Sequence, residues 1–176
     1  MKFHALCAVV VPAMLLSACS VAPLNFSPAN VAPSTKRLDA ALLSTNVTVA
    51  SKEEAVGKMN TAGAEADVSS LWKSTLDDSL VRMALFRDDS TRKVSLIVKI
   101  LELDSRGLGY GARTTARYEL VDRNSGATVF KTDVTTDGKA SDYSGANRAR
   151  KSASRSVQAN IEEFLRQIAV ADLPAR

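Results

Sequence analysis

The stretch KVSLIVKILELDSRGLGYGARTTARYELVDRNSGATVFKTDVTT, residues 93–136, decides the fold class of this chain. Alternate residues in its first part, 93–104, are apolar and would share one face of a strand: Val94, Leu96, Val98 and Ile100. Leu101 and Leu103 then move the apolar positions to the other face, which predicts a β-bulge or burial on both faces. We therefore expect a strand over residues 93–104 with one face in a core.

Two further strands follow and pair as a hairpin. Residues 110–122 alternate, so small and aromatic side chains would occupy one face: Tyr110, Ala112, Thr114, Ala116, Tyr118 and Leu120. Polar side chains would occupy the other face: Arg113, Thr115, Arg117 and Glu119. The turn RNSG at residues 123–126 joins this strand to a third one at residues 127–136, and residues 105–109 predict an earlier hairpin loop.

Helical patterns flank these strands. Residues 69–88 predict a helix with one apolar stripe, formed by Trp72, Leu76, Leu80 and Met83. Residues 144–173 predict a long final helix, whose stripe begins with alanines that allow a close approach to the sheet: Ala146, Ala149, Ala153, Val157, Ile161, Phe164 and Ile168. Residues 45–51 are β-branched and predict a short first strand, and residues 52–67 predict a loop.

The element order is therefore β-α-β-β-β-α. This order predicts an α+β fold, in which an antiparallel four-stranded sheet carries both helices on one face and leaves the other partly solvated. Residues 45–173 would form this single domain.

The N-terminus has the features of an export signal. Residues 1–18 contain one positive charge at Lys2, an apolar run interrupted by Pro12, and a small-residue end. This run is too short to span a bilayer, so we expect residues 1–18 to be a removed signal peptide. An ordinary secretory signal, with a cysteine placed after it by chance, is the alternative.

Leu16-Ser17-Ala18-Cys19 resembles the lipobox of bacterial lipoprotein signals. The resemblance implies a diacylglyceryl group on the thiol of Cys19, cleavage before this residue, and acylation of the new amine by a fatty acid such as palmitate. Two or three acyl chains hold a protein in a membrane permanently. Ser20 matches the sorting pattern of lipoproteins that reach the outer membrane, so we expect an anchor at its periplasmic face, with the inner membrane as the alternative.

The segment after the anchor is rich in proline, serine and asparagine. We expect residues 19–44 to form the lipid anchor and a flexible tether. Such a tether would reach roughly 50 to 60 Å at about 3.3 Å per residue, so the domain would stand off from the membrane.

Signal removal also limits the available chemistry. His4 and Cys7 leave with the signal and Cys19 is lipidated, which excludes histidine catalysis, histidine metal ligation and disulfides from the mature chain. The formal net charge of +4 falls by one with Lys2 and is too mild for a nucleic-acid-binding protein. No pattern indicates a cofactor or a metal site.

Two stretches resemble a family of small envelope lipoproteins of Gram-negative bacteria. They are LWKSTLDDSLVRMALF at residues 71–86 and RARKSASRSVQANIEEFL at residues 148–165. The resemblance covers about residues 45–170 and implies an anchored periplasmic domain. Relatives are often labelled UDP-N-acetylglucosamine acyltransferase, but that enzyme is a β-helix of six-residue repeats and resembles enzymes that use a catalytic histidine. This chain has no such repeat and its mature part has no histidine, so we do not expect the label to apply.

Two S-x-x-K fragments, Ser70–Lys73 and Ser90–Lys93, match the first motif of penicillin-recognising enzymes. The other motifs of those enzymes would stand here in reverse order, so we interpret both fragments as coincidence. The enzymatic alternative is a periplasmic enzyme that acts on glycan or lipid through carboxylate or serine/lysine chemistry, the acyltransferase label included.

Basic side chains mark a candidate surface for an anion or a partner. Arg148, Lys151 and Arg155 lie within one sector of the final helix, and Arg113 and Arg117 share the outward face of the second long strand. Phospholipid or lipopolysaccharide head groups or an acidic partner would suit such a patch, whereas a solvated basic helix is the simpler interpretation.

We therefore expect a non-catalytic, lipid-anchored periplasmic lipoprotein that binds or scaffolds a component of the cell envelope. Its partner would be an envelope protein or lipid head groups, bound at the basic patch or at an exposed sheet edge that accepts a strand.

Overall fold

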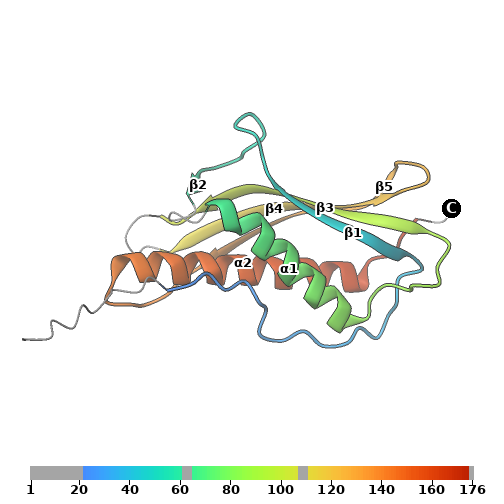
Figure 1. Ribbon diagram of the computed structural model, residues 1–176, viewed down its shortest axis with the longest axis horizontal. Helices are drawn as coiled ribbons and strands as arrows, with labels where there is room; N and C mark the ends of the chain where they lie inside the picture. The colour runs from blue at the N-terminus through green and yellow to red at the C-terminus, as the bar shows by residue number, and fades with distance from the viewer. Residues whose placement is uncertain (1–21, 61–64, 107–110, 175–176) are drawn as a thin grey trace, which may run out of the picture.

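The computed structural model describes residues 22–60, 65–106 and 111–174, and the side chains from Asp67 onward in its first helix. Its elements are β1 (Ala41–Val49), β2 (Met59–Asn60), α1 (Glu65–Met83), β3 (Lys93–Asp104), β4 (Ala112–Asp122), β5 (Thr128–Gly138) and α2 (Gly145–Val170). The strands form one sheet in the order β1-β3-β4-β5, and β2 pairs with β3 beyond the end of β1 (Figure 1). The predicted α+β order is confirmed.

The three long strands follow the sequence pattern closely. β3 has the predicted bounds, and its register with β4 shifts between Ile100 and Glu102. The shift makes Leu101 the extra residue of a β-bulge, which allows the apolar positions on both sides of it to stay in the core. A second register shift, between Leu120 and Val121, lies next to the hairpin that joins β4 and β5.

The expectation of a purely antiparallel sheet is wrong. β1 pairs with β3 in parallel, whereas β3, β4 and β5 are antiparallel to one another. The physical reason is the connection: a strand that is followed by a packed helix returns in the same direction, so β1, α1 and β3 form a crossover unit. β1 also begins at Ala41 rather than at residue 45, and α1 occupies the end of the predicted loop and ends at Met83.

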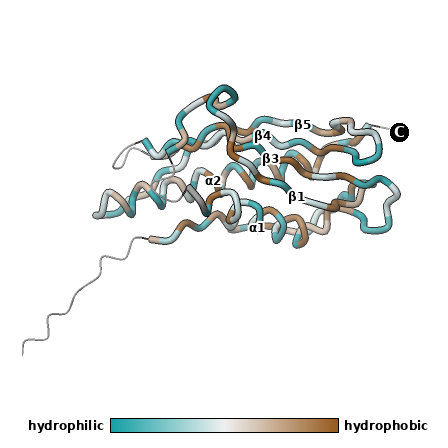
Figure 2. Tube along the Cα trace, turned by 45° about the horizontal axis from the view of Figure 1, so that its top comes forward, coloured by the Kyte–Doolittle hydropathy of each residue, from teal (hydrophilic) through white to brown (hydrophobic). Residues whose placement is uncertain are grey.

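Both helices lie on one face of the sheet, as predicted (Figure 1). The core between these layers includes Trp72, Leu96, Tyr118, Ile161 and Phe164, all fully buried. Hydrophobic colour is concentrated on the central strand β3 in Figure 2. The remaining face of the sheet, termed the outer face here, is polar and solvated.

α2 approaches the sheet most closely at Gly138. A methyl group there would clash with the backbone nitrogen of Ser156 and the carbonyl oxygen of Ser152. Small residues on α2 make this approach possible, among them Ala149, Ser152, Ala153 and Ser156, which are all buried. The predicted role of the alanines is confirmed at Ala149 and Ala153, whereas Ala146, the first residue of the predicted stripe, is exposed.

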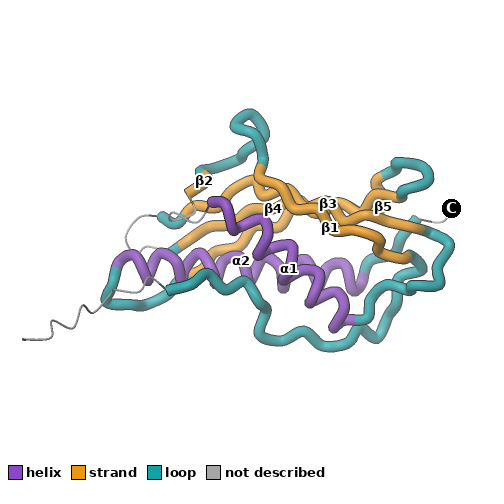
Figure 3. Tube along the Cα trace, viewed as in Figure 1, coloured by secondary structure: helices purple, strands orange, loops and turns teal. Residues whose placement is uncertain are grey.

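The prediction of a flexible tether is wrong for the described residues 22–44. Residues 22–40, termed the strap, run along both helices as one continuous loop before β1 (Figure 3). Phe26 is fully buried and packs edge-on against Trp72, with ring centroids 6.0 Å apart. Leu38 is also buried, and its N–H donates to the carbonyl oxygen of Leu85 at 2.8 Å. Apolar residues between the prolines dock the segment on the fold, which a composition-based tether interpretation overlooks.

Within the described part of the chain, neither helix combines the length and apolarity that a membrane crossing requires. Cys19 and the predicted signal peptide lie outside the described residues.

Candidate functional site

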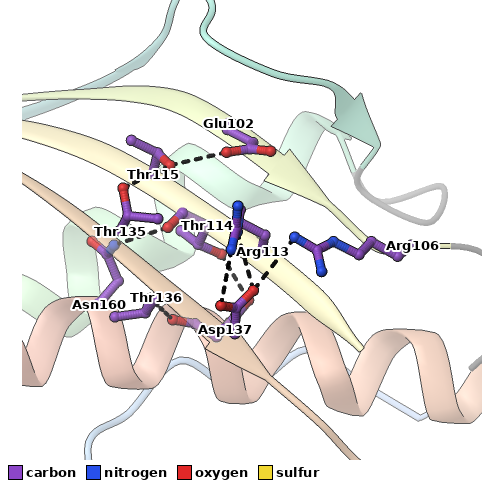
Figure 4. Close-up of polar contacts among 10 residues, drawn as sticks. Glu102, Arg106, Arg113, Thr114, Thr115, Thr135, Thr136, Asp137 and Asn160 are labelled. Carbon is purple, nitrogen blue, oxygen red and sulfur yellow. Dashed lines mark hydrogen bonds and ion pairs between the residues drawn. The ribbon is translucent and has the colours of Figure 1, made fainter. Parts of the chain in front are cut away.

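The outer face of the sheet carries a ladder of cross-strand pairs between β4 and β5. Register places four polar pairs directly opposite one another: Arg113–Asp137, Thr115–Thr135, Arg117–Asp133 and Glu119–Lys131. Three of these are ion pairs, termed the ion-pair ladder, and Thr115 links its hydroxyl to Thr135 and to Glu102 (Figure 4). Alternation along the two strands produces this arrangement, because every second side chain faces outward.

Each arginine of the ladder donates two hydrogen bonds to the aspartate opposite it. Arg117 donates from Nε and Nη2 to the two oxygens of Asp133 at 2.8 Å each, and Arg113 donates likewise to Asp137 at 3.1 and 3.2 Å. Arg106 adds a second cation to Asp137 at 3.6 Å (Figure 4). Hydrogen bonds from the guanidinium groups hold the pKa of Asp133 and Asp137 below the usual aspartate value.

The three basic residues predicted on the final helix lie together around the connection between β5 and α2. Lys151 pairs with Asp142 at 2.6 Å, and Arg148 donates to the carbonyl oxygen of Asp142 at 2.7 Å. Arg155 donates to the carbonyl oxygen of Lys139. These side chains, with Lys139, are termed the basic end.

The structure does not bring all five predicted patch residues together. Arg113 and Arg117 lie on the outer face, whereas α2 packs on the opposite face of the sheet. The sheet therefore separates the two arginines of the ladder from the basic end. The alternation of side chains along the strand predicted that Arg113 and Arg117 face outward. Their acidic partners on β5 could be identified only from the strand register in the structure.

A groove that the sequence analysis did not identify lies beside β1. It has a volume of about 790 Å³ and runs between the start of β1, the second half of α1 and the loop at residues 84–89. Apolar side chains form much of its lining: Leu42, Leu43, Leu80, Val81 and Phe86. Leu43 is 54% exposed and Val81 is 79% exposed, so the groove offers apolar surface to solvent.

The free edge of the sheet borders this groove. β1 pairs with β3 only, so in the described chain its other edge carries no strand along residues 42–49. Ala50 donates its N–H to Ile100, and the alternation of a strand then directs the backbone groups of Thr45, Val47 and Val49 away from β3. The buried hydroxyl of Thr45 lines the groove and has no hydrogen-bond partner among the described residues.

Backbone pairing on this side begins just before the groove. Residues Leu38 and Phe86 form a parallel bridge, and Arg87 donates its N–H to the carbonyl oxygen of Ala40 at 2.9 Å. The loop that follows α1 thus already occupies the edge ahead of β1. A strand added to β1 itself would continue this pairing. Because the sequence predicted a first strand that starts at residue 45, Leu42 and Leu43 were not expected to belong to the edge strand.

The groove also contains charged side chains of both signs. Lys73 pairs with Asp77 within α1, and Arg87 pairs with Asp89 at 2.9 Å.

Within the second S-x-x-K fragment, the hydroxyl of Ser90 accepts a hydrogen bond from the backbone N–H of Arg92. Neither lysine of the two S-x-x-K fragments is hydrogen-bonded to the serine of its fragment, since Lys73 binds Asp77 and Lys93 donates to the carbonyl oxygen of Asp88.

Among the residues that the structure describes, no group of three or more histidine, cysteine, aspartate or glutamate side chains is arranged to hold a metal ion.

No protein-family model matches this chain, and no curated protein matches it. A Xanthomonas campestris protein described as a member of family DUF330 is 10% identical, with a TM-score of 0.53 over 86% of this chain and 94% of its own. PelC from Paraburkholderia phytofirmans, solved as a dodecamer, is 14% identical, with a TM-score of 0.52 over 81% of this chain and 96% of its own. A minor lipoprotein from Acinetobacter baumannii is 12% identical, with a TM-score of 0.41 over 74% of this chain and 95% of its own.

The structural neighbours thus include a lipoprotein and a DUF330 protein from Gram-negative bacteria. At these identities the DUF330 protein and PelC show that this chain shares their fold.

Proposed function

We propose that this chain is a non-catalytic lipoprotein, anchored by acyl chains on Cys19 at the periplasmic face of the outer membrane. Its domain binds an extended segment of another envelope protein, which adds as a strand to the free edge of β1. The observation that carries this function is the edge of β1, which no strand of the described chain pairs, beside an open groove with exposed apolar side chains.

The anchor rests on Leu16-Ser17-Ala18-Cys19 and the apolar run before it. Metabolic labelling with a fatty acid tests it, because Cys19 is the only cysteine outside the signal. We expect label on the wild-type chain and none on Cys19→Ser. An unlabelled wild-type chain, or an intact mass that retains residues 1–18, would contradict the anchor.

An added strand would pair with the outward backbone groups of β1 and would also cover the exposed apolar side chains of the groove. The outward backbone groups of Thr45, Val47 and Val49 would gain hydrogen bonds, as in other complexes that extend a sheet. Alternate side chains of the added strand would cover Leu43 and Val81, which now face solvent. An exposed edge with apolar flanks is otherwise a liability that proteins avoid.

The directions of the carboxyl pKa shifts favour a role for these carboxylates other than general acid catalysis. A general acid at neutral pH needs a raised carboxyl pKa. Among the described residues, each carboxylate with a clear shift has a lowered pKa, through hydrogen bonds to neighbouring side chains or backbone; the set is Glu53, Glu54, Asp89, Asp122, Asp133, Asp137, Asp142 and Glu163.

Photo-crosslinking in cells that express the full chain tests the groove. A crosslinking amino acid replaces Leu43 or Val81 in the groove, or Val170 at the end of α2, which is also exposed, as a control. We expect one discrete protein adduct from both groove positions and none from Val170. Equal adducts at all three positions, or none in the groove, would contradict the proposal.

A charged substitution provides the matched variant. Val81→Lys keeps α1 intact, because the new lysine faces Asp77 one turn earlier. It should abolish the adduct formed at Leu43, whereas Val170→Lys should not. If the adduct is a second copy of this chain, the groove serves self-assembly and the proposed envelope partner is wrong. PelC, which shares the fold, was solved as a dodecamer.

A further inference from the structure

The strap follows α2 along its whole length and in the same direction. Ala22 donates its N–H to Asn147 near the start of α2 at 2.8 Å, and Asn25 donates to the hydroxyl of Ser154 at 3.1 Å. Ala29 donates to Glu162, and Lys36 reaches the carbonyl oxygen of Ala171 beyond the end of the helix. The chain therefore enters the domain at one defined end of α2 (Figure 3).

The point of entry limits how far the anchor can lie from the domain. Cys19 precedes Ala22 by three residues, which span about 11 Å at most, at ~3.6 Å per residue. Ala22 is bound to Asn147, the residue before Arg148. The acylated cysteine would thus keep Ala22 within about 11 Å of the lipid head groups, a distance similar to the Debye length of ~8 to 10 Å.

The surface at this end is cationic. At the basic end, Lys151 pairs with Asp142, Arg148 and Arg155 donate to backbone carbonyl oxygens of Asp142 and Lys139, and Lys139 interacts with Asp137. The side chain of Lys151 is 48% exposed, and the guanidinium of Arg155 is hydrogen-bonded to a backbone carbonyl rather than to a carboxylate. Positive charge next to a membrane anchor strengthens binding to anionic lipids by roughly fivefold for each side chain near the surface.

We infer that the domain stands directly on the membrane through its basic end, which contacts anionic lipid head groups, with α2 leading away from the bilayer. This inference rests on the proposed anchor at Cys19. The 26 residues of α2 place its far end about 39 Å away, at ~1.5 Å per residue. The groove beside β1 lies toward that end, next to the end of α1, so the basic end and the partner groove occupy separate regions of the molecule (Figure 1).

Fluorescence quenching by lipids tests the orientation on the lipidated full chain. Cys19 is acylated, so an introduced cysteine is the single free thiol for a dye. Tyr143→Cys places the dye beside the basic end, and Ser125→Cys places it on the exposed hairpin between β4 and β5. The vesicles contain head-group quenchers and either zwitterionic lipid alone or a mixture with about one third anionic phospholipid.

We expect strong quenching at Tyr143→Cys in anionic vesicles, at least fivefold more than at Ser125→Cys. The double variant Arg148→Glu with Lys151→Glu should reduce quenching at the first position to the level of the second. Arg82→Glu with Arg123→Glu carries the same change of charge on other exposed positions and should have no effect. Because the reversals could loosen the connection before α2, Lys151→Gln with Arg155→Gln provides a milder variant with an intermediate loss.

Equal quenching at both dye positions, or no response to either basic-end variant, overturns the orientation. Vesicle flotation and intact mass of the same samples separate this failure from failure of the anchor. A chain that is acylated and floats but shows equal quenching refutes only the orientation. A chain without acyl mass on Cys19 refutes the anchor, and with it the orientation.

Discussion

At the scale of single residues, the contact between α2 and the sheet depends on a few positions that tolerate one residue type. Gly138 leaves room for the backbone of α2, and Asn160 satisfies the polar groups buried beside it. Asn160 accepts a hydrogen bond from the hydroxyl of Tyr118 at 2.8 Å and donates to the carbonyl oxygens of Thr114 and Val134. Burial raises the pKa of the Tyr118 phenol, so it remains a donor.

Gly138→Ala should destabilise the domain by about 3 kcal/mol, since overpacking against a fixed backbone costs of the order of 1 to 3 kcal/mol. Urea unfolding followed by circular dichroism measures the loss. Gly126→Ala is the control, because its φ of 72° is strained but no atom lies within 4 Å of the added methyl group. It should cost only about 1 kcal/mol. Equal losses for the two variants would contradict the close approach of α2.

Asn160→Ala should cost about 3 kcal/mol, since it removes the acceptor of a buried phenol and two further buried hydrogen bonds to backbone carbonyl oxygens. The same unfolding measurement detects it. Asn124→Ala, in the exposed turn between β4 and β5, should change the free energy of unfolding by less than about 0.5 kcal/mol. A loss below 1 kcal/mol at Asn160 would show that this network contributes little.

At the scale of elements, the outer face of β4 and β5 is a structural ladder. Its arginines were candidates for an anion-binding patch, and each is paired with an aspartate directly across the strands. Such cross-strand pairs define the register of the hairpin, because a slip by one residue would move every charge to the apolar side. Exposed ion pairs contribute little each, so their main effect is on register and on pH dependence.

The double variant Asp133→Asn with Asp137→Asn should make the free energy of unfolding depend less on pH in the acidic range. The folded pKa of both carboxylates is lowered, so their contribution is complete above the unfolded value of about 3.9 and is lost as the pH falls through the folded values. Wild type and variant should therefore differ in urea midpoint at pH 7 and converge as the pH falls below the lowered pKa values of the folded state. Asp78→Asn with Asp88→Asn, outside the ladder, should retain the wild-type slope. Parallel curves for the ladder variant would refute the stabilising role of the two pairs.

At the scale of the whole molecule, the strap makes the N-terminal segment part of the domain. It binds α2 from Asn147 to the residues after the helix, meets α1 at Met83, and then enters β1. The start of the strap at Ala22, the two helices and the edge strand are thereby held in one arrangement. With the proposed anchor at Cys19, a domain of this kind would present a defined end to the membrane, which a flexible tether would not do.

Phe26→Ala should release the strap. Loss of a fully buried phenylalanine costs about 3 to 5 kcal/mol, and the cost is confined to the segment that it docks. Trypsin cleavage after Lys36 or Arg37 on the native chain measures the release, and we expect it to accelerate more than tenfold. Rapid cleavage of the wild-type chain at these sites would show instead that the segment is a tether in solution.

The sequence by itself determined the three long strands, the two helices, and the face to which each apolar stripe points. These features arise from local periodicity: a period of two residues for strands and of 3.6 for helices is present in the residues themselves. The bulge at Leu101 and the close helix at Ala149 and Ala153 were predicted for the same reason.

Only the tertiary structure decided the direction of β1, the partners of the outward arginines, the docking of residues 22–40 and the groove beside β1. Each of these depends on contacts between residues far apart in the chain, such as Arg117 with Asp133 or Phe26 with Trp72. The local pattern of a proline-rich segment does not reveal an apolar surface that another part of the chain offers to it. Strand direction likewise follows from the path of the crossover helix and not from the residues of the strand.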